Sequence, residues 1–324
     1  MSGASRRAGG LGVGAMAVAN VILGTSSLFW RELGAVSPAT LLGHRILVSL
    51  VTLGIALVVL GRVRAALETA ADTRLLLIHL AAAVLVCANW LAFIWGSIHG
   101  RVIETGLGYL LAPALTIALG AAVLRERLGR VRAAALGTCL LGIVLLITRS
   151  SELEWWVYVT IGTTWGTYSF LKKLTTADPV TGLALETALL ALGVGVAVAV
   201  SSYSLDPGPA ADTTDVVLLA LCGLVSVTPL WLIAYGAKKV TLTTAGFMQY
   251  VLPTTQLVVA LVCYGQRPSG NTLLCFGVVW LALVSIVAES AVRARGKRLR
   301  RPPEAAPAEH RQNLPDRQEG SRLS

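Results

Sequence analysis

The chain has 324 residues, of which 55% are hydrophobic and only 14% are charged, and its mean hydropathy is +0.72. These values exclude an ordinary soluble domain and a disordered chain, so most of the protein is expected to lie in lipid. The net charge of +10 would suit a nucleic-acid partner, but the basic residues are gathered between apolar runs, which points to membrane topology instead.

Ten apolar runs are long enough, at roughly 20 residues each, to cross about 30 Å of hydrocarbon as a helix. In lipid a helix is the only open element that satisfies its own backbone. The sequence therefore predicts an all-α integral membrane protein with ten transmembrane helices, and we keep the first run as a span, not a cleaved signal, because nine more follow. The runs lie at residues 11–30, 39–60, 75–96, 102–124, 132–148, 155–171, 181–203, 215–236, 241–263 and 272–291.

The basic residues predict the orientation of these spans. With a cytoplasmic N-terminus, 22 Lys and Arg side chains fall in inside segments, and Arg45 lies within a span. Such a bias follows the positive-inside rule and predicts a multi-pass membrane protein with both termini in the cytoplasm. The four basic residues expected outside are Arg31, Arg101, Arg149 and Arg267.

The first half of the chain is repeated in the second half. The segment from Asn89 to Pro113 reappears from Pro229 to Pro253 at a constant offset of 140 residues, and a shift of 142 residues places His44 on Glu186. Since each copy has five spans, the copies enter the membrane from opposite sides, which predicts two inverted five-helix repeats with a substrate site between them. The expected segments are a cytoplasmic N-terminal tail at 1–10, repeats at 11–149 and 150–291, and a basic, disordered cytoplasmic tail at 292–324.

Small and polar residues follow helical spacing in several spans. Tyr109 and Gln249 occupy equivalent positions in the two copies, and a polar group that faced lipid would be costly, so we expect both to line a cavity. For the glycines and prolines, close helix packing and kinks are as good an interpretation as a role at a cavity. The helix-packing candidates are Gly24, Gly106, Pro113, Gly166, Gly246 and Pro253.

Ionisable residues inside the spans are candidates for function because charges at membrane depth are costly. Glu186 has apolar neighbours on every side, and a lone carboxylate in a dry site could exchange a proton near neutral pH; a structural pair or hydrogen bond is the alternative. Arg45 could instead snorkel to the interface, and His44 could bond its own helix. His79 and Glu104 lie near span ends, where we expect solvent contact. The full set of substrate-binding or coupling candidates is Glu186, His44, Arg45, Asn89, Tyr109, Gln249, Trp165 and Asn20.

Signatures of enzymes and metal sites are missing from the sequence. The five cysteines lie in apolar runs without CxxC or Cys/His spacing, and there is no nucleotide-binding GxxxxGK[ST], HExxH or GxSxG motif. We therefore expect no catalytic residues, no metal and no cofactor.

Several strings resemble RarD proteins, which belong to the EamA-type group of the drug/metabolite transporter (DMT) superfamily. They are His44-Arg45, NWLAFIWGSIHGRVIETGLGYLLAP at 89–113, LRERLGR at 124–130, TGLALET at 181–187, VTPLW at 227–231 and GFMQYVLPT at 246–254. The resemblance implies a cofactor-free permease of the plasma (inner) membrane that has two EamA repeats and exports small organic metabolites or drugs. RarD proteins are often labelled for chloramphenicol. Gln266 departs from the resemblance, since a Glu often closes the turn there.

The leading hypothesis is a secondary-active transporter that works by alternating access around a small-molecule site, with proton coupling through Glu186 as its weaker part. An uncoupled facilitator and a membrane scaffold or receptor subunit without flux are the alternatives. The expected partners are the substrate, the lipid bilayer and, at the basic tail, anionic lipid, with no nucleic acid. The sequence leaves open the substrate, the direction, the stoichiometry and the oligomeric state.

Overall fold

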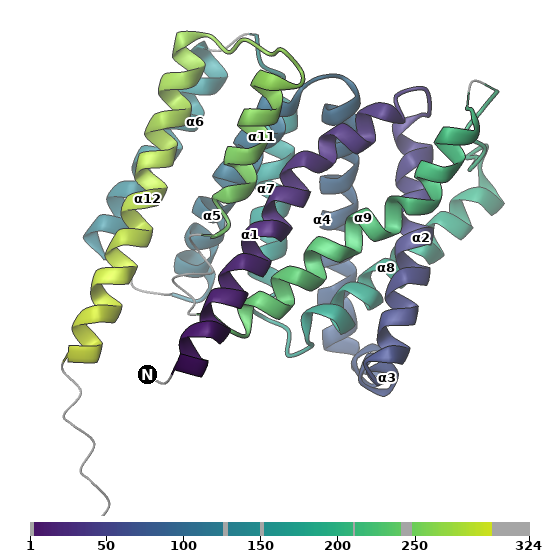
Figure 1. The fold of residues 1–324 in the computed structure, drawn as a ribbon, viewed down its shortest axis with the longest axis horizontal. Helices are drawn as coiled ribbons and strands as arrows, with labels where there is room; N and C mark the ends of the chain where they lie inside the picture. Colours follow the sequence, from purple (N-terminus) through teal and green to yellow (C-terminus); the bar gives the residue numbers. More distant parts are fainter. Residues whose placement is uncertain (1–2, 126–128, 150–151, 210, 241–247, 300–324) are drawn as a thin grey trace, which may run out of the picture.

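The computed structural model describes residues 3–125, 129–149, 152–209, 211–240 and 248–299, and within these ranges it contains helices and turns but no strand (Figure 1). The predicted all-α class is therefore confirmed for the described part of the chain. The helices are α1 (Gly3–Glu32), α2 (Pro38–Val59), α3 (Val63–Ala71), α4 (Thr73–Ile98), α5 (Val102–Val123), α6 (Arg130–Arg149), α7 (Trp155–Leu171), α8 (Pro179–Val200), α9 (Thr213–Ala237), α11 (Val251–Val262) and α12 (Gly270–Leu299).

Each expected apolar run coincides with one of these helices, although the run at 241–263 is described only from residue 248 onward. Within the described residues, six helices are long and apolar enough to cross a membrane: α1, from Gly9, and α2, α4, α5, α8 and α9. The ten-span layout stays a prediction. The short helix α3 occupies the loop expected after the second run, and α12 continues to Leu299, into the segment predicted to be a tail.

Side chains at the helix starts explain where several helices begin. Ser37 accepts a hydrogen bond from the backbone N–H of Thr40 at the start of α2, and Asp72 and Asp178 accept similar bonds at α4 and α8. Asp212 and Asp215 form a reciprocal capping box at α9. These caps matter because the first N–H groups of a helix have no partner within it.

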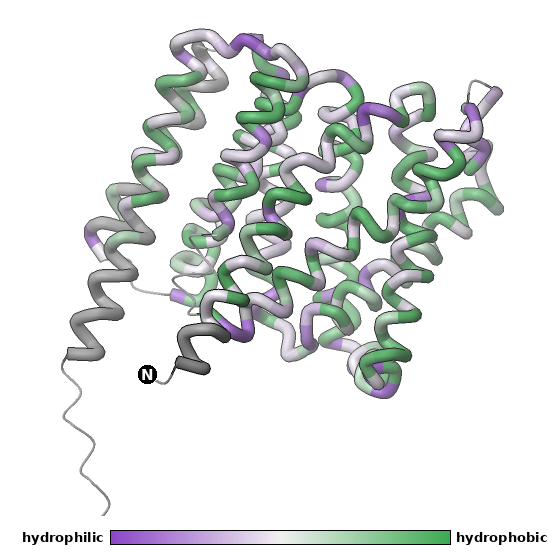
Figure 2. The backbone as a smooth tube through the Cα atoms, viewed as in Figure 1, coloured by the Kyte–Doolittle hydropathy of each residue, from purple (hydrophilic) through white to green (hydrophobic). Residues whose placement is uncertain are grey.

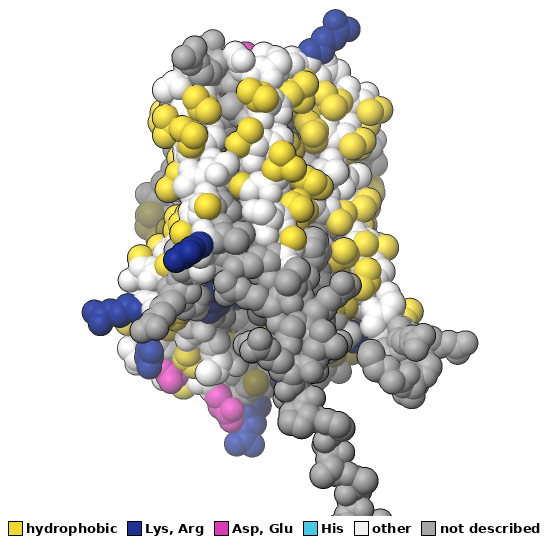
Figure 3. All heavy atoms as spheres, turned by 90° about the vertical axis from the view of Figure 1, so that its left-hand side faces the viewer, with side chains coloured by type: hydrophobic (Ala, Val, Ile, Leu, Met, Phe, Trp, Pro, Cys, Tyr) yellow, Lys and Arg dark blue, Asp and Glu magenta, His cyan; other side chains and the backbone are white. Residues whose placement is uncertain are grey.

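The helices form a bundle whose two ends are more hydrophilic than its middle (Figure 2). The N-terminal end, where α1 begins and α3 lies, is at the bottom of Figure 1, and the opposite end holds the turn between α4 and α5. Hydrophilic residues gather at the ends of the helices in Figure 2, whereas apolar residues fill the middle. On the face shown in Figure 3, apolar side chains spread over most of the described surface with few charged side chains among them, which suits a bundle that lies across a membrane.

The pattern of contacts pairs helices from the two halves of the chain. α1 packs on α9 and α11, α7 packs on α4 and α5, and α2 contacts both α8 and α9. α6 and α12 pack against each other at one edge of the bundle (Figure 1). The interior therefore lies between the halves, not within either one.

Two of the predicted packing glycines mark close helix contacts. A Cβ atom on Gly24 of α1 would lie 2.6 Å from Cβ of Thr255 on α11, and one on Gly166 of α7 would lie 2.8 Å from the carbonyl oxygen of Ala112 on α5. A Cβ atom on Gly106 of α5 would lie 3.4 Å from Cβ of Gln256 on α11, which is about an ordinary contact distance. Pro113 lies inside α5 and Pro253 in the first turn of α11, whereas Gly246 lies outside the described residues.

Replacing Gly24 by Leu is expected to lower the free energy of unfolding by about 1–3 kcal/mol, because α1 and α11 must move apart to admit the side chain. Gly14→Leu is the matched control on the same helix, since nothing lies within 4 Å of a Cβ atom at Gly14. Thermal unfolding of the detergent-purified variants, followed by tryptophan fluorescence, measures the difference. Equal midpoints for the two variants would show that Gly24 has no packing role.

Candidate functional site

A pocket lies at the centre of the bundle, and its wall comes from α1, α2, α4, α5, α7, α8, α9 and α11. The cavity volume of about 40 Å³ holds roughly three water molecules at ~10–15 Å³ each. A small polar group fits into this space, whereas a whole drug-sized molecule requires the surrounding side chains to move. The lining residues are mostly aromatic or aliphatic: Leu23, Ser26, Trp30, Arg45, Val86, Trp90, Phe93, Tyr109, Trp165, Tyr168, Leu183, Val225, Ser226, Leu230 and Leu252.

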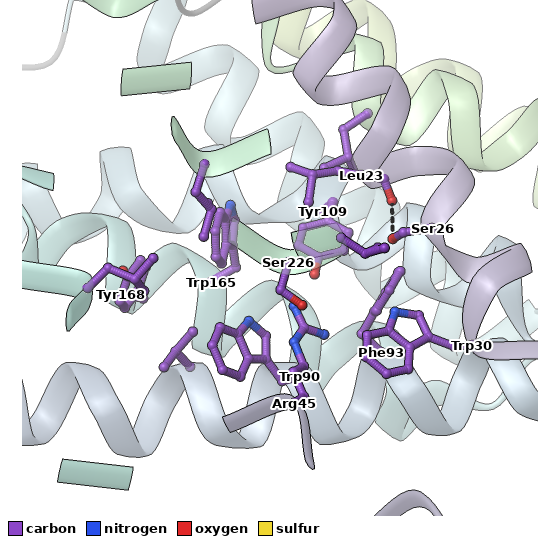
Figure 4. A pocket seen from close by; sticks show the side chains of 15 residues that line it. Leu23, Ser26, Trp30, Arg45, Trp90, Phe93, Tyr109, Trp165, Tyr168 and Ser226 are labelled. Carbon is purple, nitrogen blue, oxygen red and sulfur yellow. Dashed lines mark hydrogen bonds between the residues drawn. The ribbon is translucent and has the colours of Figure 1, made fainter. Parts of the chain in front are cut away.

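Arg45 of α2 carries the charge in this lining. Its side chain is only 6% exposed, and its guanidinium carbon lies 4.2 Å from the ring centroid of Trp90 and 5.1 Å from that of Trp30. Figure 4 shows the guanidinium between these two rings, close to Ser226 and below Tyr109. Arg45 therefore does not snorkel to an interface; it points into the centre of the protein.

Asn89 lies behind the pocket wall and fixes Tyr109. The Tyr109 hydroxyl donates to Oδ1 of Asn89 at 2.9 Å, and Nδ2 of Asn89 donates to Oγ1 of Thr164 at 3.2 Å. The rings of Tyr109 and Trp165 meet edge to face with centroids 5.7 Å apart. Three residues predicted from the sequence, Asn89, Tyr109 and Trp165, are thus brought together across α4, α5 and α7.

Glu186 forms a second polar group towards the N-terminal end. Its side chain is fully buried, with Oε1 bound by Nδ1 of His79 at 2.7 Å and by Nζ of Lys172, and Oε2 bound by the Tyr168 hydroxyl at 2.9 Å. Nε2 of His79 lies 3.0 Å from Oγ1 of Thr175. We call these five residues the Glu186 cluster.

The cluster agrees with the alternative that the sequence left open for Glu186, a structural pair or hydrogen bond, and corrects the expectation for His79. Glu186 is not a lone carboxylate among apolar neighbours, because three side chains donate to it. His79 was expected in solvent, and that was wrong: its side chain is fully buried because α8 covers the start of α4. Gly182 permits this approach, since a Cβ atom there would lie 2.8 Å from Cε1 of His79.

Glu104 anchors a third polar group at the opposite end. Its side chain is also fully buried, against our expectation of solvent contact. Arg101 donates to its Oε1 at 3.3 Å, the backbone N–H of Glu154 donates to the same atom at 3.4 Å, and Nε2 of Gln266 donates to Oε2 at 3.4 Å. The loop before α7 and the loop after α11 cover this carboxylate. Its position near a helix end in the sequence suggested solvent contact and could not reveal this cover.

Further contacts at this end join the first and second halves of the chain. Nη1 of Arg31 donates to the Cys263 carbonyl at 2.9 Å, and the Tyr264 hydroxyl donates to the Ser27 carbonyl at 2.8 Å. Oε1 of Gln266 accepts hydrogen bonds from the backbone N–H groups of Val102 and Ile103 at 3.1 and 3.0 Å, so a distant side chain caps α5.

Five of the eight predicted site residues lie outside the pocket lining: Glu186 and Asn89, described above, and Asn20, His44 and Gln249. Nδ2 of Asn20 donates to the Met16 carbonyl of its own helix at 2.8 Å. His44 is half-buried, and its Nδ1 lies 3.0 Å from the Thr40 carbonyl, also on its own helix. Gln249 is exposed.

Sequence reasoning missed Trp30, Phe93 and Ser226, which line the pocket. The signal for Trp30 was the spacing of Leu23, Ser26 and Trp30 along α1, which places these residues on one helix face. That face is adjacent to the small-residue face that contains Gly24. The sequence favoured Asn20, on the small-residue face, as a site residue, whereas Gly24 of that face contacts α11.

An aromatic pocket at the centre of a bundle of apolar helices defines the class: a multi-pass membrane protein with an internal site. Residues 10–148 match the EamA-like transporter family. An uncharacterized transporter of Vibrio cholerae serotype O1 is 31% identical over 81% of this chain and 86% of its own length, and the RarD protein of Streptomyces exfoliatus is 30% identical over 86% and 88%. A solved crystal structure with 16% identity shares the fold, at a TM-score of 0.54 over 85% of this chain and 96% of that one.

The chain therefore belongs to the EamA-like transporters of the drug/metabolite transporter superfamily, with RarD proteins as homologues over most of its length. This is a family of membrane transporters and not of enzymes.

Replacing Gln266 by Ala is expected to lower the free energy of unfolding by about 1 kcal/mol, the typical effect of losing a helix N-cap. Gln249→Ala removes the same side chain from an exposed position and should leave stability nearly unchanged. Thermal unfolding in detergent compares the two variants with the natural protein. A Gln266→Ala midpoint equal to that of the control would refute the capping role.

Proposed function

We propose that this protein is a secondary-active permease of the RarD type that moves small organic molecules across the plasma (inner) membrane by alternating access. The observation that carries the proposal is the position of the central pocket between two groups of contacts, one at each end of the bundle. Each group joins the first half of the chain to the second half. Opening one group while the other stays closed would expose the pocket to one side at a time.

The N-terminal closure consists of the Glu186 cluster and the ion pair between Arg62 and Asp178, whose charged atoms lie 3.6 Å apart. The opposite closure consists of the contacts around Glu104 together with those of Arg31 and Tyr264. Both closures are polar and hydrogen-bonded, so they can be exchanged for water when an end opens.

Two inverted five-helix repeats would produce this arrangement. In such repeats α1 would correspond to α7, α2 to α8, α4 to α9 and α5 to α11. The observed contacts follow this correspondence: α1 packs on α9 as α7 packs on α4, and α1 packs on α11 as α7 packs on α5. The family match to residues 10–148 has nearly the bounds expected for the first repeat. These observations support a pseudo-twofold axis through the pocket.

The basic side chains favour an orientation with the N-terminal end in the cytoplasm. Arg62, Arg64, Arg74, Lys172 and Lys238 all lie in or beside loops at that end. The positive-inside rule places such an end on the cytoplasmic side. The outward direction of transport, and drugs such as chloramphenicol as cargo, rest on the family resemblance.

Proton coupling would act through Glu186. As a carboxylate on α8 it holds one donor from α4, one from α7 and one from Lys172, directly after α7. Protonation would remove the charge that attracts Lys172. The N-terminal closure would then loosen. A transporter built in this way opens towards the cytoplasm more readily when Glu186 is protonated.

The Glu186→Gln variant is expected to lose the dependence of transport on pH while it still binds substrate, because an amide cannot exchange the proton. Substrates are first found by a thermal-shift screen of metabolites and antibiotics, chloramphenicol included; a ligand at 100 times its dissociation constant adds about 2.7 kcal/mol. Flux of a hit into proteoliposomes is then measured across a pH gradient. Glu68→Gln, at an exposed carboxylate of α3, should behave like the natural protein.

The same experiment separates the alternative functions. Accumulation of the hit against its own gradient requires a coupled carrier, whereas equilibration alone indicates a facilitator. Binding without any flux would support a receptor or scaffold and would contradict the proposed function. Unchanged pH dependence in Glu186→Gln would remove proton coupling through this residue and leave transport intact.

A further inference from the structure

The buried guanidinium of Arg45 lacks the partners that such a group requires. Its Nε and Nη1 atoms are buried, and neither has a hydrogen-bond partner. Within the part of the chain that the structure describes, no carboxylate lies within 4.0 Å of its nitrogen atoms. A buried charge without a partner is strongly unfavourable, so the resting pocket contains an unsatisfied cation.

The buried carboxylates that the structure describes do not supply the missing charge. Glu186 already accepts hydrogen bonds from three side chains, and Glu104 is held at the opposite end of the bundle by Arg101 and Gln266. Neither residue lines the pocket. The undescribed segment between α9 and α11, TLTTAGF at 241–247, contains no Asp or Glu.

The hydroxyl groups of the lining have partners. Oγ of Ser226 donates to the Cys222 carbonyl at 2.7 Å, Oγ of Ser26 donates to the Leu23 carbonyl at 2.7 Å, and the Tyr109 hydroxyl donates to Asn89. Among the lining residues, all of which are described, only Arg45 has buried nitrogen atoms without an acceptor. The free hydrogen-bonding capacity of the pocket is therefore that of a donor with a positive charge.

The surroundings of Arg45 define the rest of the ligand. The rings of Trp30 and Trp90 lie on either side of the guanidinium, with ring centroids 5.1 and 4.2 Å from its carbon atom (Figure 4). A planar guanidinium can donate two parallel hydrogen bonds to a bidentate acceptor such as a carboxylate. Phe93, Trp165 and Leu252 provide an apolar wall beyond it. The small cavity volume admits the acidic group at rest, and the apolar body would be accommodated as the pocket opens.

We propose that the pocket binds an organic monocarboxylate with an aromatic body, whose carboxylate pairs with Arg45; this assignment rests on the proposed transport function. The pocket lining contains no acidic side chain that would pair with an ammonium group, so an acid without an amine is preferred to a zwitterion or an amine. One guanidinium also matches one negative charge, so a monoanion is preferred to a dianion.

The test uses the purified full chain and a series of probes that share a phenyl ring and differ in the polar group: phenylacetate, phenylacetamide, phenylalanine, phenethylamine and phenyl phosphate. Binding is measured by thermal shift and by the change in tryptophan fluorescence, since Trp30, Trp90 and Trp165 line the pocket. Phenylacetate is expected to bind at least about 30-fold more tightly than its amide, the factor that corresponds to leaving a buried charge unpaired. Equal binding of the acid and the amide, or tighter binding of phenyl phosphate or phenethylamine, would overturn the proposal.

Variants at Arg45 provide the second arm. Arg45→Met keeps the length of the side chain without its charge and is expected to weaken phenylacetate binding roughly 30-fold or more, while its unliganded form melts at or above the temperature of the natural protein, because the unpaired charge is gone. Arg45→Lys keeps the charge but not the planar fork and should retain part of the affinity. Arg64→Met, at an exposed arginine, is the control and should bind phenylacetate like the natural protein.

The outcomes separate this proposal from the proposed function. If no aromatic acid binds but a neutral hit such as chloramphenicol is transported, the anion site is wrong and the transporter stands. If phenylacetate binds through Arg45 but no probe crosses a proteoliposome membrane, the site stands as that of a receptor and the transport function is wrong. Undiminished phenylacetate binding in Arg45→Met would overturn the role of Arg45 even if the compound is transported.

Discussion

In an apolar bundle every charged side chain must find its partners inside the protein, and this constraint decides how the halves of the chain fit together. Glu186 meets it by accepting hydrogen bonds from His79 of α4, from Tyr168 in the last turn of α7 and from Lys172 directly after that helix. Glu104 meets it through loops that are distant in sequence. These long-range bonds fix the ends of the bundle, and the helices between them can pack by shape alone.

Shape is supplied by small residues on one face of a helix and by large aromatic residues on the neighbouring face. On α1, Gly24 lies against α11 while Trp30 reaches the pocket; on α7, Gly166 lies against α5 while Trp165 reaches the same pocket. Glycine allows two helix backbones to approach closely. In both helices the large aromatic side chain on the neighbouring face then points into the pocket beside that contact. Close packing and an aromatic pocket are thus produced by the same helices.

The order and bounds of the helices could be predicted well from the sequence, because long apolar runs have one stable form in lipid and capping residues mark several of their starts. The face of each helix that points inward could not be predicted. Lipid and the protein interior are equally apolar, so hydrophobicity does not distinguish a face that contacts lipid from one that contacts protein. Asn20 was therefore predicted as a site residue, whereas its side chain bonds its own helix outside the pocket lining. The burial of His79 and Glu104 was missed because it depends on partners about a hundred residues or more away, Glu186 and Gln266. Arg45, Tyr109 and Trp165 were found because polar and amphipathic side chains at span depth are unfavourable anywhere else.

Tyr168 belongs both to the pocket and to the Glu186 cluster: its ring lines the cavity, and its hydroxyl is one of the three donors to the carboxylate. Any molecule that displaces this ring changes the hydrogen bonding of Glu186 at the same moment, without touching it. Thermodynamic linkage makes such an effect mutual, so occupancy of the pocket and the protonation of a carboxylate outside it must alter each other by equal amounts of free energy. In the proposed transport mechanism, the phenol of Tyr168 would therefore couple ligand binding in the pocket to the contacts of the N-terminal closure.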